Sequence, residues 1–204
     1  MVKPLVLAST SKWRAAMLTR LGLVFTQMAP GFDELSVTEG TPREMAMACA
    51  LGKARAAASA LESGWVIGSD QVADLEGTRL HKPATTQEAA KRLEQLSGKW
   101  HALHTAVVLV EAGGGAEHTS MTTVRLKMKE LTTDEINHYI AVDNPVGCAG
   151  AYMIEGLGVA LFDEIQGCDE SAIVGLPLLA LCGLLRKVGI EPLSGLPGSL
   201  TGHG

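Results

Sequence analysis

The sequence predicts an α/β fold, in which short buried strands alternate with capped helices. The apolar run Leu5–Ala8 is typical of a buried strand, and the segment after it repeats apolar residues at helical spacing. A second apolar run, Trp65–Ile67, follows a long alanine-rich segment with a helix start signal. Because strand and helix patterns alternate along the chain, we expect helices to cover the faces of a sheet.

Composition is that of an ordinary globular protein with room for one large domain or two small lobes. The chain has 204 residues, of which 47% are hydrophobic and 19% are charged, and this balance excludes a disordered chain. Its formal net charge is −5. That charge argues against a nucleic-acid-binding protein, whose affinity depends on neutralising phosphates.

The expected cellular location follows from the absence of membrane-span and secretory-signal patterns in the sequence. No apolar stretch reaches the length of a membrane span, and the first residues do not resemble a secretory signal. The four cysteines are scattered without a zinc-binding spacing. We therefore expect a cytoplasmic protein with reduced thiols and with neither a membrane nor a nucleic-acid partner.

Cap and turn residues predict the remaining elements. Thr41, Pro42 and Glu44 begin a helix that is expected to run to about Ser63, where Gly64 ends it. The segment 194–204 is rich in glycine and serine and is expected to be a disordered tail, which leaves residues 1–193 as one domain. Further strands are expected at 23–28, 101–111, 118–129, 150–155 and 158–162, and further helices after Thr85, after Thr132 and up to about Val188.

The first strand leads into a candidate phosphate site. Ser9 and Ser11 can donate hydroxyl hydrogen bonds, and Arg14 lies in the first turn of the following helix. The N-terminus of a helix attracts anions, and a guanidinium binds phosphate oxygens through paired hydrogen bonds. Alternatively, Ser11 only caps the helix and Arg14 is solvated.

Charged residues farther along the chain are candidates for chemistry, each with a simpler alternative. Asp33 and Glu34 follow a turn, where adjacent carboxylates are usually solvated. Lys53 lies in the alanine-rich helix, where a lysine is ordinarily a surface residue. Asp70 and Gln71 are expected at the carboxyl end of a strand, where open α/β sheets bind ligands, although an aspartate there can instead cap a turn.

An ordered set of motifs extends over about residues 5–190. Its segments are Leu7–Arg14, Asp33–Glu34, Lys53–Ala54, Gly68–Gln71, Lys82–Pro83, Ser97–Gly98, Ala149–Tyr152, Glu155–Gly158 and Val174–Leu178. Each motif alone has low specificity, but the set in this order is highly specific. It closely resembles the Maf family of nucleotide pyrophosphatases.

The resemblance implies an α/β fold with an elongated mixed sheet, flanking helices and two lobes around a central cleft, as in Maf and ITPase-like proteins. It also implies a homodimer that hydrolyses a nucleoside triphosphate between its α and β phosphates. The products would be a monophosphate and pyrophosphate. The expected cofactor is a divalent metal, Mg²⁺, Mn²⁺ or Co²⁺, which carboxylate oxygens hold well.

The same resemblance assigns roles to particular residues. It implies a catalytic set of Asp70, Glu34, Lys53 and Lys82, with Glu34 and Asp70 also as the metal ligands. Asp70 is the usual candidate for the proton acceptor, and the sequence leaves open whether it is base, ligand or both. The matching phosphate-binding positions are Ser9, Ser11 and Arg14.

Three residues resemble the branch of the family that hydrolyses 7-methyl-GTP, namely Trp13, Gln71 and Glu155. Methylation at N7 makes guanine cationic, and an indole stacks well on a cation. A carboxylate accepts two hydrogen bonds from guanine, and an amide adds an adaptable contact. The alternative for Trp13 is core packing with Met17 and Leu21. Two other functions stay open, namely hydrolysis of dTTP and UTP, and non-catalytic nucleotide-dependent regulation of division.

Overall fold

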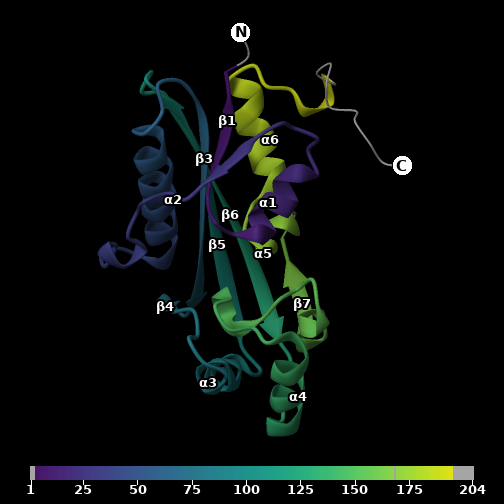
Figure 1. Ribbon diagram of the computed structural model, residues 1–204. Helices are drawn as coiled ribbons and strands as arrows, with labels where there is room; N and C mark the ends of the chain where they lie inside the picture. The colour runs from purple at the N-terminus through teal and green to yellow at the C-terminus, as the bar shows by residue number, and fades with distance from the viewer. Residues whose placement is uncertain (1–2, 168, 195–204) are drawn as a thin grey trace.

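The computed structural model describes residues 3–167 and 169–194, which form a mixed sheet with helices on both faces (Figure 1). The seven-stranded sheet has the order β2-β1-β3-β5-β6-β7, and β4 pairs with β3. The strands are β1 (Leu5–Ala8), β2 (Thr26–Met28), β3 (Gly64–Leu75), β4 (Thr78–Leu80), β5 (Trp100–Ala112), β6 (Glu117–Met128) and β7 (Phe162–Gln166). The helices are α1 (Lys12–Thr19), α2 (Pro42–Ala58), α3 (Thr86–Leu96), α4 (Thr133–Asp143), α5 (Ser171–Val174) and α6 (Leu178–Lys187). Four 3₁₀ segments complete the list, namely η1 (Glu34–Ser36), η2 (Ala149–Ala151), η3 (Leu157–Leu161) and η4 (Pro192–Ser194). The predicted α/β class is confirmed.

Helix α2 begins where its cap residues predict. The Thr41 side chain accepts a hydrogen bond from the Glu44 backbone, and the Glu44 carboxylate accepts from the Thr41 backbone at 2.8 Å. Pro42 occupies the first turn, where its missing N–H leaves no bond unmade. Thr132 and Glu135 form the same reciprocal pair at the start of α4.

Alternation along β3 divides the upper core between two helical layers. Val66 and Val72 pack with the alanines of α2 on one face of the sheet. Trp65 and Ile67 pack with α1 and α6 on the opposite face. A separate core lies at the lower end of the sheet, where α3, α4 and η3 meet the ends of β3, β5 and β6. The two predicted lobes are these two ends of one continuous sheet (Figure 1).

Strand β3 continues past the end of its parallel neighbour, and this leaves an opening. It pairs with β1 over residues 65–67 and with β4 over residues 73–75. Among the described strands, only β5 pairs with the stretch between. Asp70 and Gln71 therefore lie inside a strand, and the prediction that they follow its carboxyl end is wrong. They lie instead beyond the carboxyl end of β1, on opposite faces of the sheet.

Other predicted boundaries are corrected. Helix α2 ends at Ala58 instead of Ser63, because Ala60 and Leu61 bond to carbonyls three residues back and tighten the chain. The strands predicted at 150–155 and 158–162 are wrong. Gly150 and Ala151 have φ values of 74° and 63°, which extended strands do not adopt. The strand predicted at 23–28 is shorter, and residues 195–204 of the predicted tail lie outside the described residues. The domain boundary at 193 stays a prediction.

No helix within the described ranges is long and apolar enough to cross a membrane.

His101 of β5 is buried in the lower core with 4% of its surface exposed. Its Nε2 lies 2.8 Å from the Tyr152 hydroxyl, and its ring packs against Tyr152 and Phe162. Its Nδ1 has no hydrogen-bond partner in the described part of the chain. Burial lowers the pKa of His101 from 6.5 to about 4, so the folded protein holds this ring neutral at pH 7.

We expect the lower lobe to lose stability in mild acid through His101. Its folded pKa lies below its unfolded value, so its stabilising contribution is complete above pH 6.5 and is lost as the pH falls toward about 4. The loss amounts to about 3 kcal/mol. Urea denaturation of wild type and of His101→Gln between these pH values checks this, with the exposed His138→Gln as control. An equally steep decline in His101→Gln would contradict it.

Gly68 sets how closely α2 approaches the sheet. A Cβ at this position would collide with the Ala50 carbonyl oxygen and would lie 2.8 Å from the Ala54 Cβ. Both neighbours belong to α2 and are fully buried. Contact this tight is possible only because glycine has no side chain.

We expect Gly68→Ala to push α2 away from β3 and to lower the free energy of unfolding by about 1 to 3 kcal/mol. Gly183→Ala is the matched control, since Gly183 is exposed in α6 with nothing within 4 Å of an added Cβ. That change should raise stability by up to about 1 kcal/mol. Thermal unfolding measures both, and equal effects of the two substitutions would refute the argument.

Candidate functional site

Lys53 is the centre of a buried charge cluster. Its Nζ lies 2.6 Å from Glu34 Oε1 and 2.6 Å from Asp70 Oδ1. Lys53 is 3% exposed and Asp70 is 2% exposed. Helix α2 directs Lys53 toward the sheet, between the alanines that pack on Gly68. The surface alternative for Lys53 is therefore contradicted, and the Glu34 carboxylate, although 37% exposed, is paired with this lysine.

The adjacent carboxylates Asp33 and Glu34 have different surroundings. Asp33 caps η1, because its Oδ1 accepts from the Leu35 backbone at 2.9 Å. Glu34 is half-buried and also lies 3.8 Å from Lys82 Nζ. Burial alone would raise the pKa of Glu34, but the hydrogen bond to Lys53 and the charges of Lys53, Lys82 and Arg14 hold it below its usual value. Glu34 is therefore ionised at neutral pH and faces the cations.

Ser9, Ser11 and Arg14 meet at the start of α1. The Ser9 hydroxyl oxygen accepts from the Ser11 backbone at 3.2 Å and from Arg14 Nη1 at 3.4 Å. Ser11 caps the helix, as the simpler alternative proposed. Arg14 is not freely solvated, because its Nε donates to the Gly175 carbonyl at 2.9 Å. This corner therefore presents a positioned guanidinium at a helix N-terminus.

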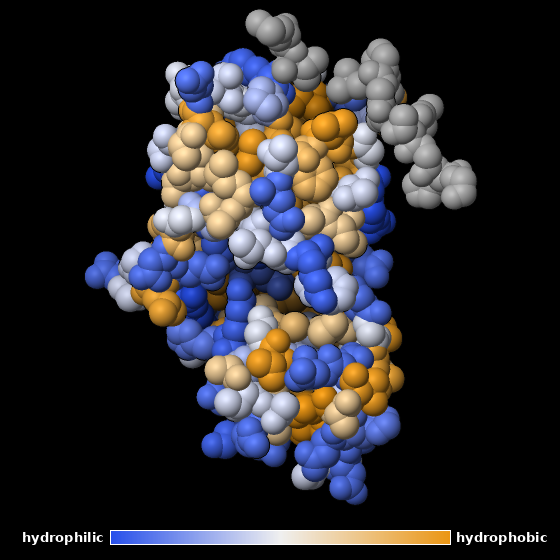
Figure 2. Space-filling model, viewed as in Figure 1, coloured by the Kyte–Doolittle hydropathy of each residue, from blue (hydrophilic) through white to orange (hydrophobic). Residues whose placement is uncertain are grey.

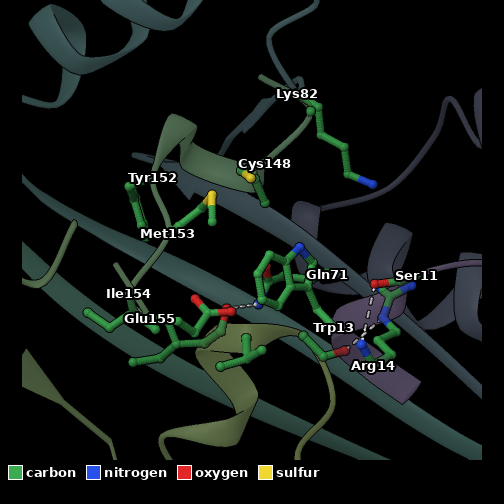
Figure 3. Close-up of a pocket in the computed structure, with 15 residues that line it drawn as sticks. Ser11, Trp13, Arg14, Gln71, Lys82, Cys148, Tyr152, Met153, Ile154 and Glu155 are labelled. Atoms are coloured by element: carbon green, nitrogen blue, oxygen red, sulfur yellow. Dashed lines mark hydrogen bonds between the residues drawn. The ribbon is translucent and has the colours of Figure 1, made fainter. Parts of the chain in front are cut away.

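Trp13 lies on the open side of α1 with 38% of its surface exposed. Met17 and Leu21 pack against the core, while Trp13 lines a hollow that it shares with Glu155 (Figure 3). The core-packing alternative for Trp13 is therefore contradicted. The Lys12 ammonium lies 4.9 Å from the Trp13 ring centre, within the range of a cation–π interaction.

Gln71 is more constrained than the sequence predicts. Its side-chain nitrogen donates to the carbonyls of Ala172 and Ile173 at 2.7 and 3.0 Å and contacts the Thr105 hydroxyl at 3.0 Å. With the nitrogen bound to α5, only the carbonyl oxygen remains for a ligand in the hollow. Ser69 lies nearby, and its hydroxyl is within 2.9 Å of the Gly175 carbonyl.

Two adjoining hollows connect these groups. The first contains Trp13, Arg14 and Glu155, and the second contains Glu34 and Asp70. Their volumes are about 220 and 170 Å³, so together they reach the usual range for small-molecule sites, about 300 to 1,000 Å³. Figure 2 shows the molecule hollowed between its upper and lower parts. Both hollows are lined by Gln71, Lys82 and Ala149.

The structure thus brings the predicted site residues together, while their roles stay predictions. Ser9 and Lys53 lie behind the hollows and contact residues that line them. Sequence reasoning gave no site role to Arg79 and Cys148, which line the hollows, or to Thr105, which contacts Gln71. Arg79 could have been found from the Glu76–Gly77 turn, because a hairpin there places Arg79 opposite Asp74 and on the same face as Asp70.

Glu34 and Asp70 are the candidate metal ligands. No group of three or more His, Cys, Asp and Glu side chains in the described ranges could hold a metal ion. Two carboxylates that contact one lysine nitrogen do, however, suit Mg²⁺, which commonly binds one or two carboxylates together with substrate phosphates. The donor set is therefore compatible with a metal that the substrate helps to hold.

Comparison with known proteins identifies the family of this chain. The family of Maf-like proteins matches residues 4–188. A 7-methyl-GTP pyrophosphatase of Polaromonas sp. is 43% identical over 92% of this chain and 86% of its own length. A 7-methyl-GTP pyrophosphatase of Xanthomonas oryzae pv. oryzae is 42% identical over 94% of this chain and 99% of its own.

A solved structure of a nucleoside-triphosphatase, dITP/XTP pyrophosphatase from Mycobacterium abscessus covers 95% of this chain and 100% of its own, with a TM-score of 0.46 and 15% identity. The resemblance predicted from the ordered motifs is confirmed by the family match and by the sequence relatives. Because both extend over most of its length, the chain belongs to the Maf family.

Proposed function

We propose that this protein hydrolyses 7-methyl-GTP between the α and β phosphates and releases 7-methyl-GMP and pyrophosphate. The observation that carries the proposal is the junction of two hollows, one with an exposed indole and a carboxylate, the other with the Lys53 charge cluster. The names of the relatives from Polaromonas and Xanthomonas support this substrate.

The first hollow suits a cationic purine. The Trp13 face would stack on 7-methylguanine, and the Glu155 carboxylate would accept from its N1–H and exocyclic amine (Figure 3). The Gln71 oxygen supplies a further acceptor, since the Gln71 nitrogen is bound to α5. A pyrimidine offers neither the fixed positive charge nor the paired donors that these groups favour.

The second hollow suits attack by water on the α-phosphorus. A bond forms between the water oxygen and phosphorus, the bond to the β-phosphate oxygen breaks, and pyrophosphate leaves. Asp70 is our candidate to accept the proton, and the ammonium of Lys53 holds its carboxylate in position. Lys82, which is half-exposed beside Glu34, can neutralise phosphate charge.

We also propose that Glu34 and Asp70 hold a divalent cation, Mg²⁺, Mn²⁺ or Co²⁺, together with the substrate phosphates. When bound, such an ion neutralises negative charge on the phosphates and activates water. The sequence resemblance further motivates a homodimer, and the scattered cysteines motivate a cytoplasmic location. Sedimentation of the purified protein tests the homodimer.

A substrate panel tests the function. Purified protein is incubated with 7-methyl-GTP, GTP, dTTP and UTP, with each metal and without metal, and pyrophosphate release is measured. We expect the highest kcat/KM with 7-methyl-GTP and a dependence on metal. Preference for dTTP and UTP would replace our substrate with that of the other branch.

Trp13→Ala should raise the KM for 7-methyl-GTP by roughly tenfold and affect GTP much less, because the stacking contribution depends on the charge of the base. Trp100→Ala is the matched control, since Trp100 lies in the lower lobe, where it contacts Arg125. Equal changes in KM for both nucleotides in Trp13→Ala would show that the indole does not sense the methyl group.

Asp70→Asn should reduce kcat at least about a hundredfold, because the proton acceptor is lost. Asp74→Asn is the control, since Asp74 lies on the same face of β3 but bonds to His104 and the Gly77 backbone. Single-turnover assays measure both variants. If the wild type hydrolyses none of the tested nucleotides, and Asp70→Asn affects cell division as the wild type does, the non-catalytic regulatory function is favoured.

A further inference from the structure

Arg79 of β4 lines the second hollow together with Glu34, Asp70 and Lys82. Its partner in the β3–β4 hairpin is Asp74, so the side chain of Arg79 lies on the sheet face that also carries Asp70. Neither the family motifs nor the mechanism above assigns this arginine a role.

The hydrogen bonds of Arg79 leave one edge of its guanidinium available. Nη1 donates to the Val37 carbonyl at 3.2 Å and contacts Met45 Sδ at 3.9 Å. Within the described ranges, Nε and Nη2 make no hydrogen bond, and the side chain forms no ion pair. In Arg55 of the same protein this edge binds an anion through two hydrogen bonds. Its Nε and Nη2 each donate to one Glu117 oxygen at 2.7 Å.

The hydrogen bond to Val37 and the available Nε/Nη2 edge together make Arg79 suited to bind an anion. Half-burial and the bond to Val37 restrict the rotamers of Arg79, so less conformational entropy is lost when it binds. Lys53 cannot take its place, because its ammonium is already paired with Glu34 and Asp70. A protein with a net charge of −5 needs such a local cation to hold a polyphosphate.

Its location indicates which part of the substrate Arg79 meets. Gln71, Lys82 and Ala149 line both hollows, whereas Arg79 lines only the second. Lys82 therefore lies at the junction, and a nucleotide with its base between Trp13 and Glu155 that extends into the second hollow brings its distal phosphates into the space that Arg79 lines with Asp70. The phosphates beyond the scissile bond are the β and γ phosphates.

We propose that Arg79 binds the β,γ-diphosphate of the substrate, and the departing pyrophosphate, through its Nε/Nη2 edge. This inference rests on the proposed function in placing the scissile bond near Asp70, but binding of pyrophosphate can be measured without turnover.

The test compares two ligands by calorimetry in the presence of Mg²⁺, namely pyrophosphate and 7-methyl-GMP. Arg79→Gln should weaken pyrophosphate about tenfold, the contribution of a charge-assisted hydrogen bond, and leave 7-methyl-GMP unchanged. Arg79→Lys keeps the positive charge but loses the paired N–H donors, so its pyrophosphate affinity should lie between those of the wild type and Arg79→Gln. This variant also tests the proposal if Arg79→Gln does not fold. Arg43→Gln is the matched control, an exposed arginine in the first turn of α2.

Kinetics adds a second readout. In Arg79→Gln the KM for the triphosphate and the inhibition constant for pyrophosphate should rise together. Equal weakening of both calorimetric ligands, or unchanged pyrophosphate affinity in variants that melt like the wild type, overturns the role of Arg79. Arg79-dependent binding of pyrophosphate in a protein that does not hydrolyse 7-methyl-GTP overturns the proposed substrate and retains the diphosphate site.

Discussion

The ion cluster around Lys53 is the constraint on which the site depends. An isolated ammonium inside a protein is costly, and removing one partner from a buried ion pair typically destabilises a protein by about 3 to 5 kcal/mol. Lys53 is tolerated because Asp70 on β3 and Glu34 on η1 both contact its nitrogen. Three segments distant in sequence must therefore meet before the lysine charge is compensated, so the same contacts that close the fold also place the carboxylates.

Close packing of α2 makes that meeting possible. A lysine reaches Asp70 only if its helix backbone lies near the strand, and Gly68 provides that space two residues before Asp70. Ala50 and Ala54 are one helical turn apart on either side of Lys53 in the sequence, and all three are buried. The alanine-rich composition of α2 is thus part of the site, since larger side chains would hold the lysine away from the sheet.

Local patterns predicted much of the fold. The start of α2 followed from Thr41 and Glu44, and strand β1 from its apolar run. The strand content of Gly68–Gln71 could not be predicted in this way, because these residues suit turns as well as strands. They are extended because β5 pairs with them through residues 105–108, which are far away in sequence. Gly150 and Ala151 were wrongly predicted to lie in a strand. Their left-handed backbone conformation cannot be recognised from the pattern of apolar residues.

The candidate site was predictable only as an ordered set of motifs. Residue chemistry left Lys53 and Trp13 as ordinary surface and core residues, and the resemblance alone joined them. Arg79 escaped both approaches, because its position depends on the register of the β3–β4 hairpin and not on a motif. Register is set by the turn and by which face is buried, so a single wrong strand boundary is enough to hide such a residue.

The loop between α5 and α6 helps to hold two side chains that line the first hollow, Arg14 and Gln71. Its Gly175 carbonyl accepts from Arg14 and from Ser69, and the end of α5 accepts from Gln71. Under the proposed function, Arg14 would meet the phosphates and Gln71 the base, so one short segment would position both. A displacement of α5 that loosened the contact with the base would therefore also move the guanidinium. Under the proposed function, a change that alters the contact of Gln71 with the base is therefore coupled to the orientation of Arg14.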